Sequence, residues 1–380
     1  MTLFFLSLSL LIGILATLYV LGVTVDKFLI PTIYIIKDKL RLSDDQTGAL
    51  TSFVSSAPEL SVSLISLVLA IQANDSKKFA EIAALGPGAV IGSALFSVLF
   101  IVGASAWYST KSLTWHSVTR DMLYYIFAVG ALFLSLLDGV IYWYEAVILL
   151  GLYCIYALIV SYWIPISKIL KIPGTTIPTK EIEDSENLAS HLRDEKWGIK
   201  NLVPKIISYG FFRISNKLNT ISIIYNTLFA ILLIVISSYF MVEFATKLAT
   251  NWSVPGVIIA LTILAAGTSV PDLIASVKTA KDGYGDTAIT NAIGSNVFDI
   301  LGNLGLTWVI SAIFTGGRPI VIDTNNLTGS ILLLIASSIA LILILIAGKF
   351  NLNKFVSALL MISYILYVIF ICAQALQLIK

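Results

Sequence analysis

The sequence predicts an all-α polytopic membrane protein of about ten transmembrane helices, organised as two inverted five-helix repeats. Three observations predict this fold. Of the 380 residues, 58% are hydrophobic and only 12% are charged. Apolar runs of about 20 residues, the length that a helix needs to cross a bilayer, recur from one end of the chain to the other. Two segments of the first half also reappear in the second half.

The apolar runs place ten spans along the chain. They are expected at 2–25, 46–73, 82–107, 121–140, 141–163, 218–246, 253–277, 286–313, 327–347 and 355–378. Each is expected to be a helix, because backbone groups in lipid must pair within their own segment and no alternating barrel pattern occurs. The first run lacks a basic leader and is long for a signal peptide, so we interpret it as a true span. Only Asp138 and Gly139 separate the fourth and fifth runs.

The distribution of basic residues orients the chain. With the N-terminus outside, 19 of the 24 Lys and Arg fall in inside segments and 5 fall in outside segments. Positive charge concentrates on the cytoplasmic side of membrane proteins, so both termini are expected outside the plasma membrane. The polar connection 164–217 is then a cytoplasmic loop that joins two five-helix halves, 1–163 and 218–380.

Composition excludes several other classes. The net charge of +2 is too small, and the basic residues are too scattered, for a nucleic-acid-binding protein. Cys154 and Cys372 lie in apolar runs and suggest neither a disulfide framework nor a metal site, so we interpret them as packing residues. His116 and His191 fall in predicted loops without a ligand partner at useful spacing. No cofactor is expected, and the protein is expected to function as a monomer in the lipid bilayer.

An internal repeat joins the two halves. The segment "TSVPDLIAS" at 268–276 aligns with "SSAPELSVS" at 55–63, at an offset of 213 residues. The alignment matches a proline with a proline, and it matches the carboxylate that follows each of them, Asp272 with Glu59. Each copy therefore has a helix-breaking residue beside a carboxylate in an apolar run.

The repeat continues through the next helix. The segment "IGSNVFDILGNLG" at 293–305 aligns with "IGSALFSVLFIVG" at 91–103, at an offset of 202 residues. The two complete copies, about 52–106 and 264–310, lie five crossings apart, and an odd separation turns the second copy upside down in the membrane. Inverted repeats are typical of secondary transporters, which bind substrate and coupling ions between the repeats near the bilayer midplane.

The proline and the carboxylate of each copy indicate a cation site. A proline within a helix removes one backbone donor and frees carbonyl oxygens, here near Ser55 and Thr268. Carbonyls, hydroxyls and a carboxylate form the all-oxygen environment that Ca²⁺ and Na⁺ require. A carboxylate within the membrane costs about 2.5 kcal/mol or more and is rarely without a partner. Because the second, third, seventh and eighth spans contain no Lys or Arg in their apolar cores, a cation is the natural partner of Glu59 and Asp272.

These paired motifs resemble the two alpha repeats of the calcium/cation antiporter superfamily, and within it the sodium/calcium exchangers. The stretch "GTSVPDLIASVKTAKDGYGDTAITNAIGSNVFDI", which begins at Gly267, is most similar to the potassium-dependent branch of that family. The resemblance implies a transporter, not an enzyme, that exchanges Ca²⁺ for Na⁺ by alternating access.

The resemblance also implies the residues of the ion sites. Glu59 and Asp272 would be the central Ca²⁺-binding carboxylates, and Asp299 would line the flanking Na⁺ sites. Neutral oxygens would complete the shells at the two helix breaks and on the neighbouring helices. These implied neutral ligands are Ser55, Ser56, Thr268, Ser269, Ser93, Ser295, Asn291 and Ser97.

Three positions of the first repeat depart from the family pattern. Ser55 stands where the family usually has Gly or Thr, and Ser97 stands where it usually has Asn or Asp. Ala89, the counterpart of Asn291, cannot coordinate an ion. These departures leave the stoichiometry and the coupling ion open among Na⁺, H⁺, K⁺ and Li⁺, so proton/calcium exchange and potassium-dependent sodium/calcium exchange remain alternatives.

Two rival classes share parts of the pattern. The "GYGD" at 283–286 matches a motif of intramembrane aspartyl proteases, but a second aspartate that follows tyrosine occurs nowhere in the chain. A passive cation channel would share the ligand chemistry, yet a site with two carboxylates should bind too tightly for rapid conduction. Asp282 and Asp286 are better interpreted as a turn followed by a helix N-terminus.

Overall fold

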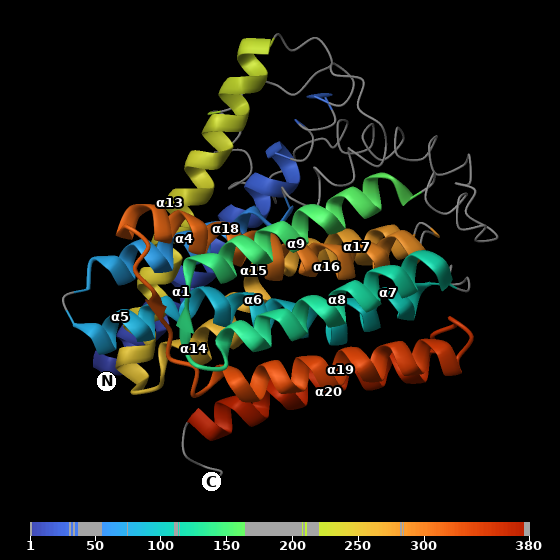
Figure 1. The fold of residues 1–380 in the computed structure, drawn as a ribbon. Coiled ribbons are helices and arrows are strands. Elements are labelled where there is room, and N and C mark those ends of the chain that lie inside the picture. Colours follow the sequence, from blue (N-terminus) through green and yellow to red (C-terminus); the bar gives the residue numbers. More distant parts are fainter. Residues whose placement is uncertain are drawn as a thin grey trace.

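The computed structural model describes most of the chain. The described residues are 2–29, 32, 35–36, 55–73, 75–109, 113, 115–163, 207, 210, 220–281, 283 and 285–375. Helices make up nearly all of this part (Figure 1). The predicted loop 164–217 and the predicted residues 46–54 of the second span lie outside it, apart from Ile207 and Gly210.

In the first half, five helical runs follow one another. The second begins after Ser56, and the third contains a π-helical turn. Their segments are α1 (Thr2–Thr24) with η1 (Val25–Leu29), α4 (Ala57–Ile71), α5 (Ser76–Ala83) with α6 (Leu85–Leu95), η2 (Phe96–Ile101) and α7 (Val102–Tyr108), α8 (Trp115–Leu136), and α9 (Trp143–Ser161).

The second half has the same order of five runs. Its second run is broken at Ser269, and its third again contains a π-helical turn. Its segments are α13 (Thr220–Trp252), α14 (Gly256–Ile259) with η4 (Ala260–Leu264), α15 (Ala265–Thr268) and α16 (Val270–Lys281), α17 (Gly285–Val297) with η5 (Phe298–Asn303) and α18 (Leu304–Thr315), α19 (Leu327–Ala347), and α20 (Lys354–Ala375).

The membrane fold predicted from the sequence is confirmed. Among the described residues, nine helical runs are long and apolar enough to cross a bilayer. The described part of the remaining span, α4, has 15 residues and is shorter than such a crossing. The fourth and fifth spans are two separate helices: the fourth ends at Leu136, and the fifth begins at Trp143. Between them, Val140–Ile141 forms a strand, β1, that pairs antiparallel with β2 (Ile320–Val321), a small sheet that the sequence analysis did not predict.

Backbone irregularities recur at the offsets of the sequence repeat. The breaks at Ser56 (φ −84°, ψ 9°) and Ser269 (φ −90°, ψ 2°) lie 213 residues apart. Each precedes a proline by two residues, and a proline has no N–H to continue the helix ladder. The π-helical turns η2 and η5 begin 202 residues apart. Such turns are rare and occur frequently at functional sites.

Packing follows the same symmetry. A Cβ on Gly103 would lie 2.9 Å from the Ser357 carbonyl oxygen in α20, and a Cβ on Gly305 would lie 2.8 Å from the Leu150 nitrogen in α9. Gly103 and Gly305 are repeat counterparts, and α20 and α9 are both the fifth helix of their halves. Each third run therefore packs closely on the fifth helix of the other half, as two inverted repeats require.

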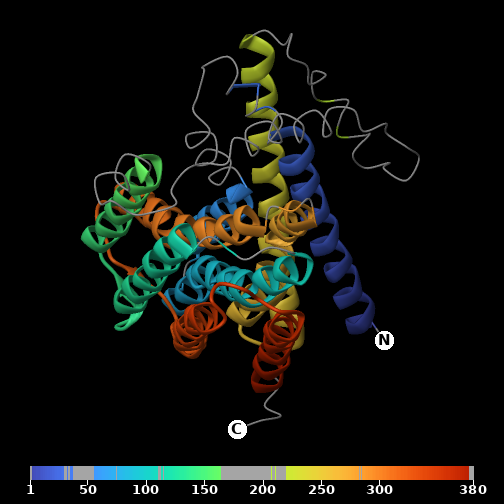
Figure 2. The ribbon, with the colours of Figure 1, turned by 90° about the vertical axis from the view of Figure 1, so that its right-hand side faces the viewer.

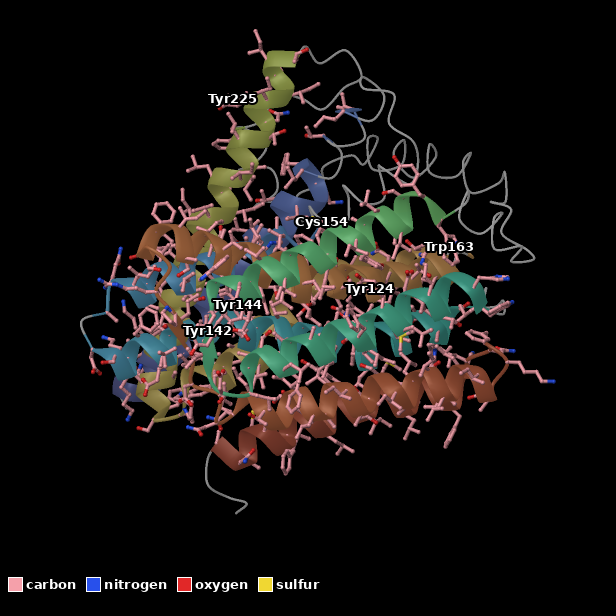
Figure 3. The ribbon with its side chains drawn as sticks, in the orientation of Figure 1. Tyr124, Tyr142, Tyr144, Cys154, Trp163 and Tyr225 are labelled. Carbon is pink, nitrogen blue, oxygen red and sulfur yellow. The ribbon has the colours of Figure 1, made fainter. Side chains whose placement is uncertain are left out.

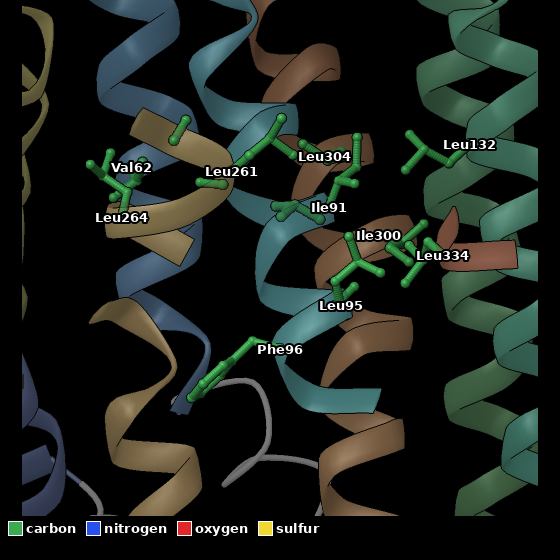
Figure 4. Close-up of a cluster of buried hydrophobic side chains, with 14 of the residues drawn as sticks. Val62, Ile91, Leu95, Phe96, Leu132, Leu261, Leu264, Ile300, Leu304 and Leu334 are labelled. Carbon is green, nitrogen blue, oxygen red and sulfur yellow. The ribbon is translucent and has the colours of Figure 1, made fainter. Parts of the chain in front are cut away.

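Apolar side chains fill the space between the repeat helices. Val62 of α4, Leu261 and Leu264 of η4, Ile91 of α6 and Ile300 of η5 are all buried in one cluster (Figure 4). Helices α1 and α13 lie beside each other at the edge of the bundle (Figure 2). Dense packing around the breaks holds the polar groups there in fixed positions.

The ends of the helices have aromatic residues. On α9, Tyr142 and Tyr144 lie at one end and Trp163 lies just beyond the other (Figure 3). Aromatic residues at both ends are typical of helices that cross a bilayer. Cys154 is exposed on α9 and Cys372 is half-buried, both as free thiols, so the interpretation of Cys154 as a packing residue is wrong. His116, predicted in a loop, lies in the first turn of α8 against the ring of Trp115.

We predict that Gly92→Ala lowers stability. A Cβ at this position would collide with the Leu261 carbonyl oxygen and would lie 2.6 Å from the Ala265 Cβ. Overpacking of this kind costs about 1–3 kcal/mol. The measurement is the apparent melting temperature of the purified protein in detergent.

Gly130→Ala is the matched control, because it also lies within a helix and a Cβ there would meet no atom within 4 Å. It is expected to leave the melting temperature unchanged or to raise it, since Ala is a better helix former by about 1 kcal/mol. An equal effect of the two substitutions would contradict close packing at Gly92.

Candidate ion-binding site

Each central carboxylate reaches the helix break of the other repeat. Glu59, in the first turn of α4, is 1% exposed, and its Oε1 accepts a hydrogen bond from the Ser269 hydroxyl at 3.5 Å. Thr268, on the other side of the same break, is a second polar neighbour of this carboxylate, and its hydroxyl donates to the Ala265 carbonyl oxygen at 3.3 Å. Asp272, in the first turn of α16, has the hydroxyl of Ser55, at the break of the first repeat, as a polar neighbour. The contacts are reciprocal, so the two repeats share one polar centre.

A serine of the neighbouring helix joins this centre. The hydroxyl oxygens of Ser93, on α6, and Ser269 lie 2.7 Å apart in a hydrogen bond. The α6 helix can approach so closely because Gly92 has no side chain to separate it from η4 and α15. The structure thus brings three predicted site residues, Glu59, Ser93 and Ser269, into one chain of contacts.

A third carboxylate lies on the other side of the centre. Asp299 is 2% exposed and lies in η5, close enough to Glu59 and Asp272 for their charges to interact. Ser56 and Asn303 are its polar neighbours. Its counterpart in the first repeat, Ser97, is also buried and lies in η2. The π-helical turns therefore present one acidic and one hydroxyl side chain from equivalent positions.

Several oxygens of the centre have no hydrogen-bond partner. They are Ser56 Oγ, Glu59 Oε2 and Asp299 Oδ1, all three fully buried. A buried polar atom without a partner costs about 1–3 kcal/mol, and more when it is charged. Oxygens from a hydroxyl and two carboxylates are the ligands that hard cations take. The arrangement can therefore hold cations, which would satisfy these atoms.

The geometry also limits how a cation is held. Within the described part of the chain, no three His, Cys, Asp or Glu side chains are close enough together to hold one ion. A Ca²⁺ ion takes about 6–8 oxygen ligands. An ion here would consequently need hydroxyl or carbonyl oxygens in addition to the carboxylates, and the two helix breaks are the nearest source.

The other predicted residues are less central. The Ser295 hydroxyl donates to the Ala292 carbonyl oxygen within its own helix at 3.2 Å. Asn291 is half-buried on α17, one turn before Ser295. Asp286 follows the first residue of α17, as a turn followed by a helix start predicts, and Asp282 lies outside the described residues.

The sequence analysis missed two amides. Both side-chain polar atoms of Asn296 are buried without a partner, and so is Nδ2 of Asn303. Asn296 and Asn303 lie three residues before and four residues after Asp299, so all three share one helix face. That spacing was visible in the sequence and could have identified them.

Comparison with known proteins agrees with this architecture. The model of the family described as sodium/calcium exchanger protein matches residues 10–162 and 222–373. Sodium/potassium/calcium exchanger 2 of Gallus gallus is 25% identical over 94% of this chain and 76% of its own length. Sodium/potassium/calcium exchanger 5 of Homo sapiens is 26% identical over 87% of this chain and 75% of its own length.

Solved structures share the fold. The sodium–calcium exchanger NCX_Mj superposes with a TM-score of 0.51 and 18% identity, over 96% of this chain and 98% of that chain. The H⁺/Ca²⁺ exchanger CAX superposes with a TM-score of 0.57 and 14% identity, over 99% of this chain and 88% of that chain. These similarities support the helical exchanger fold and give no support to an intramembrane protease.

The family match covers most of both five-helix halves and leaves out the connection between them. It contains both proline-carboxylate breaks and both π-helical turns, from which the polar centre is built. The protein therefore belongs to the sodium/calcium exchanger protein family, a family of membrane transporters and not of enzymes.

Proposed function

We propose that this exchanger moves Ca²⁺ in one direction against Na⁺ in the other, with Glu59 and Asp272 as the central Ca²⁺ ligands. One observation carries the proposal: each of these carboxylates contacts the helix break of the opposite repeat. An ion bound between them would contact both halves of the molecule at once. Its binding is then sensitive to any movement of one half against the other.

Charge balance supports antiport. Two carboxylates neutralise one Ca²⁺, and Asp299 adds a third negative charge to the same buried region. Like charges repel strongly where water is excluded. A centre without ions therefore resists closure, and a centre loaded with cations can close and reopen on the other side. Transport in one direction then requires a return with other cations.

The flanking polar groups suit monovalent ions. Asp299 has the neutral side chains of Ser56 and Asn303 as neighbours, so this set has one charge in place of two. Smaller total ligand charge favours Na⁺ or K⁺ over Ca²⁺. We therefore assign the Na⁺ sites to the side of the centre that η5 provides, together with Ser93 and Ser295.

Potassium-dependent exchange is the second candidate. It is favoured by the two relatives named above, which are sodium/potassium/calcium exchangers and align with 94% and 87% of this chain. Proton/calcium exchange has weaker support, because the H⁺/Ca²⁺ exchanger resembles this chain in fold alone.

The membrane arrangement completes the proposal. The protein is an integral membrane protein, and we place it in the plasma membrane with both termini outside, the loop 164–217 in the cytoplasm, and one chain as the functional unit. The support is the excess of Lys and Arg in the segments that this orientation places inside.

A flux experiment tests the coupling. Proteoliposomes loaded with Na⁺ and diluted into Na⁺-free medium should take up radiolabelled Ca²⁺, because the outward Na⁺ gradient provides the driving force. Uptake should stop when Na⁺ is equal on both sides. Parallel samples with K⁺ and with a pH gradient identify the coupling ion, and uptake that follows only the pH gradient would reject Na⁺ exchange.

Amide substitutions test the two carboxylates. Glu59→Gln and Asp272→Asn keep the shape of the side chain and remove its charge. Each should weaken Ca²⁺ binding by at least about tenfold, which corresponds to about 1.4 kcal/mol, as measured by calorimetry on the purified protein. Folding should be preserved, since removal of an unpaired buried charge is not expected to destabilise the protein.

Asp286→Asn provides the matched control. It makes the same chemical change at the second residue of α17, 13 residues before Asp299. Its effect on Ca²⁺ binding should be small. Normal binding by Asp272→Asn together with loss of binding by Asp286→Asn would reject the proposed centre.

Cysteine labelling tests the orientation. In a variant without the two native cysteines, Cys154 and Cys372, a cysteine at Ser185 should be protected from an impermeant thiol reagent in intact cells. A cysteine at Asn325, in the segment between α18 and α19, should react. The opposite pattern would invert the proposed topology.

A further inference from the structure

We propose that two lanes of buried and half-buried hydroxyl groups lead from the central carboxylates to opposite faces of the membrane and serve as ion access routes. The proposal rests on the exchange function proposed above. The first lane lies on α4 and α18, and the second lies on α16 and α7. The first lane comprises Ser63, Ser66, Thr307 and Ser311, and the second comprises Ser276, Thr279, Ser105 and Ser109.

Each lane begins one helical turn beyond a central carboxylate. Ser63 follows Glu59 by four residues on α4, and Ser276 follows Asp272 by four residues on α16. Residues four apart lie on the same face of a helix. Since the second repeat is inverted relative to the first, α4 and α16 leave the centre in opposite directions. The two lanes therefore approach opposite faces.

The two lanes are also counterparts in the repeat. Ser63 and Ser66 align with Ser276 and Thr279 at the offset of 213, the same that aligns the two central carboxylates. Thr307 and Ser311 align with Ser105 and Ser109 at the offset of 202. Every member of one lane thus has a hydroxyl-bearing partner in the other.

The helices that bear each lane pack against each other. Helix α4 contacts η5, α18 and α6, and α16 contacts η2, α7 and α17, the corresponding set. At the first lane, a Cβ on Gly86 of α6 would lie 3.1 Å from the Ser63 Cα and 3.1 Å from the Ser66 Oγ. At the second lane, a Cβ on Gly285 of α17 would collide with the Ser109 side chain. A glycine on the third helix therefore lies against the hydroxyls in both lanes.

Four of these hydroxyls are buried and have no hydrogen-bond partner. They are Ser63 and Ser311 in the first lane and Ser276 and Ser105 in the second, each no more than 1% exposed. Other buried helical hydroxyls donate to their own helix, as Ser338 does to Leu334 and Ser357 does to Asn353. Unsatisfied groups of this kind are uncommon and call for a ligand such as water or an ion.

The chemistry of the lanes suits passage more than retention. The lane side chains are neutral, so they replace part of an ion's water shell without the charge of the central carboxylates. Conduction requires binding that is favourable enough for an ion to enter and weak enough for it to leave. Neutral hydroxyl oxygens meet this requirement for a Na⁺ or Ca²⁺ ion that keeps a few of its water molecules.

Accessibility of substituted cysteines tests the lanes. Ser63→Cys and Ser276→Cys are made separately in a variant with Cys154→Ala and Cys372→Ala, and each purified protein is reconstituted into liposomes. A small, positively charged, impermeant thiosulfonate is then added to one side at a time. We expect the two cysteines to react from opposite sides, and we expect Ser105→Cys to react from the same side as Ser276→Cys.

Ser61→Cys is the matched control. Ser61 is buried on α4, two residues before Ser63, but its hydroxyl is hydrogen-bonded to Ser238 of α13. It should react at least about tenfold more slowly than Ser63→Cys, because no lane reaches it. Gel filtration of each variant before reconstitution confirms that a slow rate does not come from misfolded protein.

The outcomes separate the lanes from the proposed function. Equal reactivity of Ser61→Cys and Ser63→Cys, or reaction of Ser63→Cys and Ser276→Cys from one side, would overturn the lanes even if Na⁺-driven Ca²⁺ flux is intact. The expected pattern of sides supports the lanes whatever ion is transported. Slower labelling of Ser63→Cys in the presence of Ca²⁺ or Na⁺ would further support a shared route for these ions.

Discussion

The reciprocal contact between each central carboxylate and the helix break of the opposite repeat is the constraint on which the rest of the site depends. Glu59 lies against Thr268 and Ser269, and Asp272 lies against Ser55, so the centre is built from both halves of the molecule. Breaking a helix within lipid exposes backbone groups, which is tolerated only where they are buried in protein. The contacts of one repeat provide that burial for the other.

The irregular backbone of the centre is expensive and is therefore confined to a few turns. The prolines prevent an unbroken helix at Ser56 and Ser269, and the π-helical turns η2 and η5 lie on the adjacent helices. Two further π-helical segments, η1 and η4, lie in the first and seventh helical runs, and apolar side chains pack the helices around the centre. The packed helices around the two breaks keep the polar groups together. The boundary between the two halves remains a surface along which one half can move against the other.

The sequence predicted the architecture well, because length and hydropathy determine where helices cross a bilayer. Pro58 and Pro271 located the breaks, and the alignment located Ser97 and Asp299 at equivalent positions. The π-helical turns could not be predicted, since they depend on packing between helices and leave no mark in composition. The sheet between Val140–Ile141 and Ile320–Val321 was also missed, because two residues per strand give no periodic pattern.

Predictions of single residues were less complete, for a related reason. The repeat alignment does not mark Asn296 and Asn303, because their counterparts in the first repeat are Ala94 and Ile101, whereas the helix face that they share with Asp299 does. Cys154 was misplaced because an apolar run in a membrane helix includes residues that face lipid as well as residues that face the core. Hydropathy identifies the helix, but it does not distinguish the two faces.

The fold is symmetric, and its chemistry is not. Where the second repeat has the polar residues Asn291, Asn296, Asp299 and Asn303, the first repeat has Ala89, Ala94, Ser97 and Ile101. The amides and the third carboxylate are thus concentrated on one helix run, α17 with η5. Ca²⁺ at the breaks would be shared equally by both halves, while a monovalent ion beside Asp299 would be held mainly by the second half. The two ions would then make different contacts with the two halves. In an exchanger, such a difference allows each ion to favour a different arrangement of the two repeats.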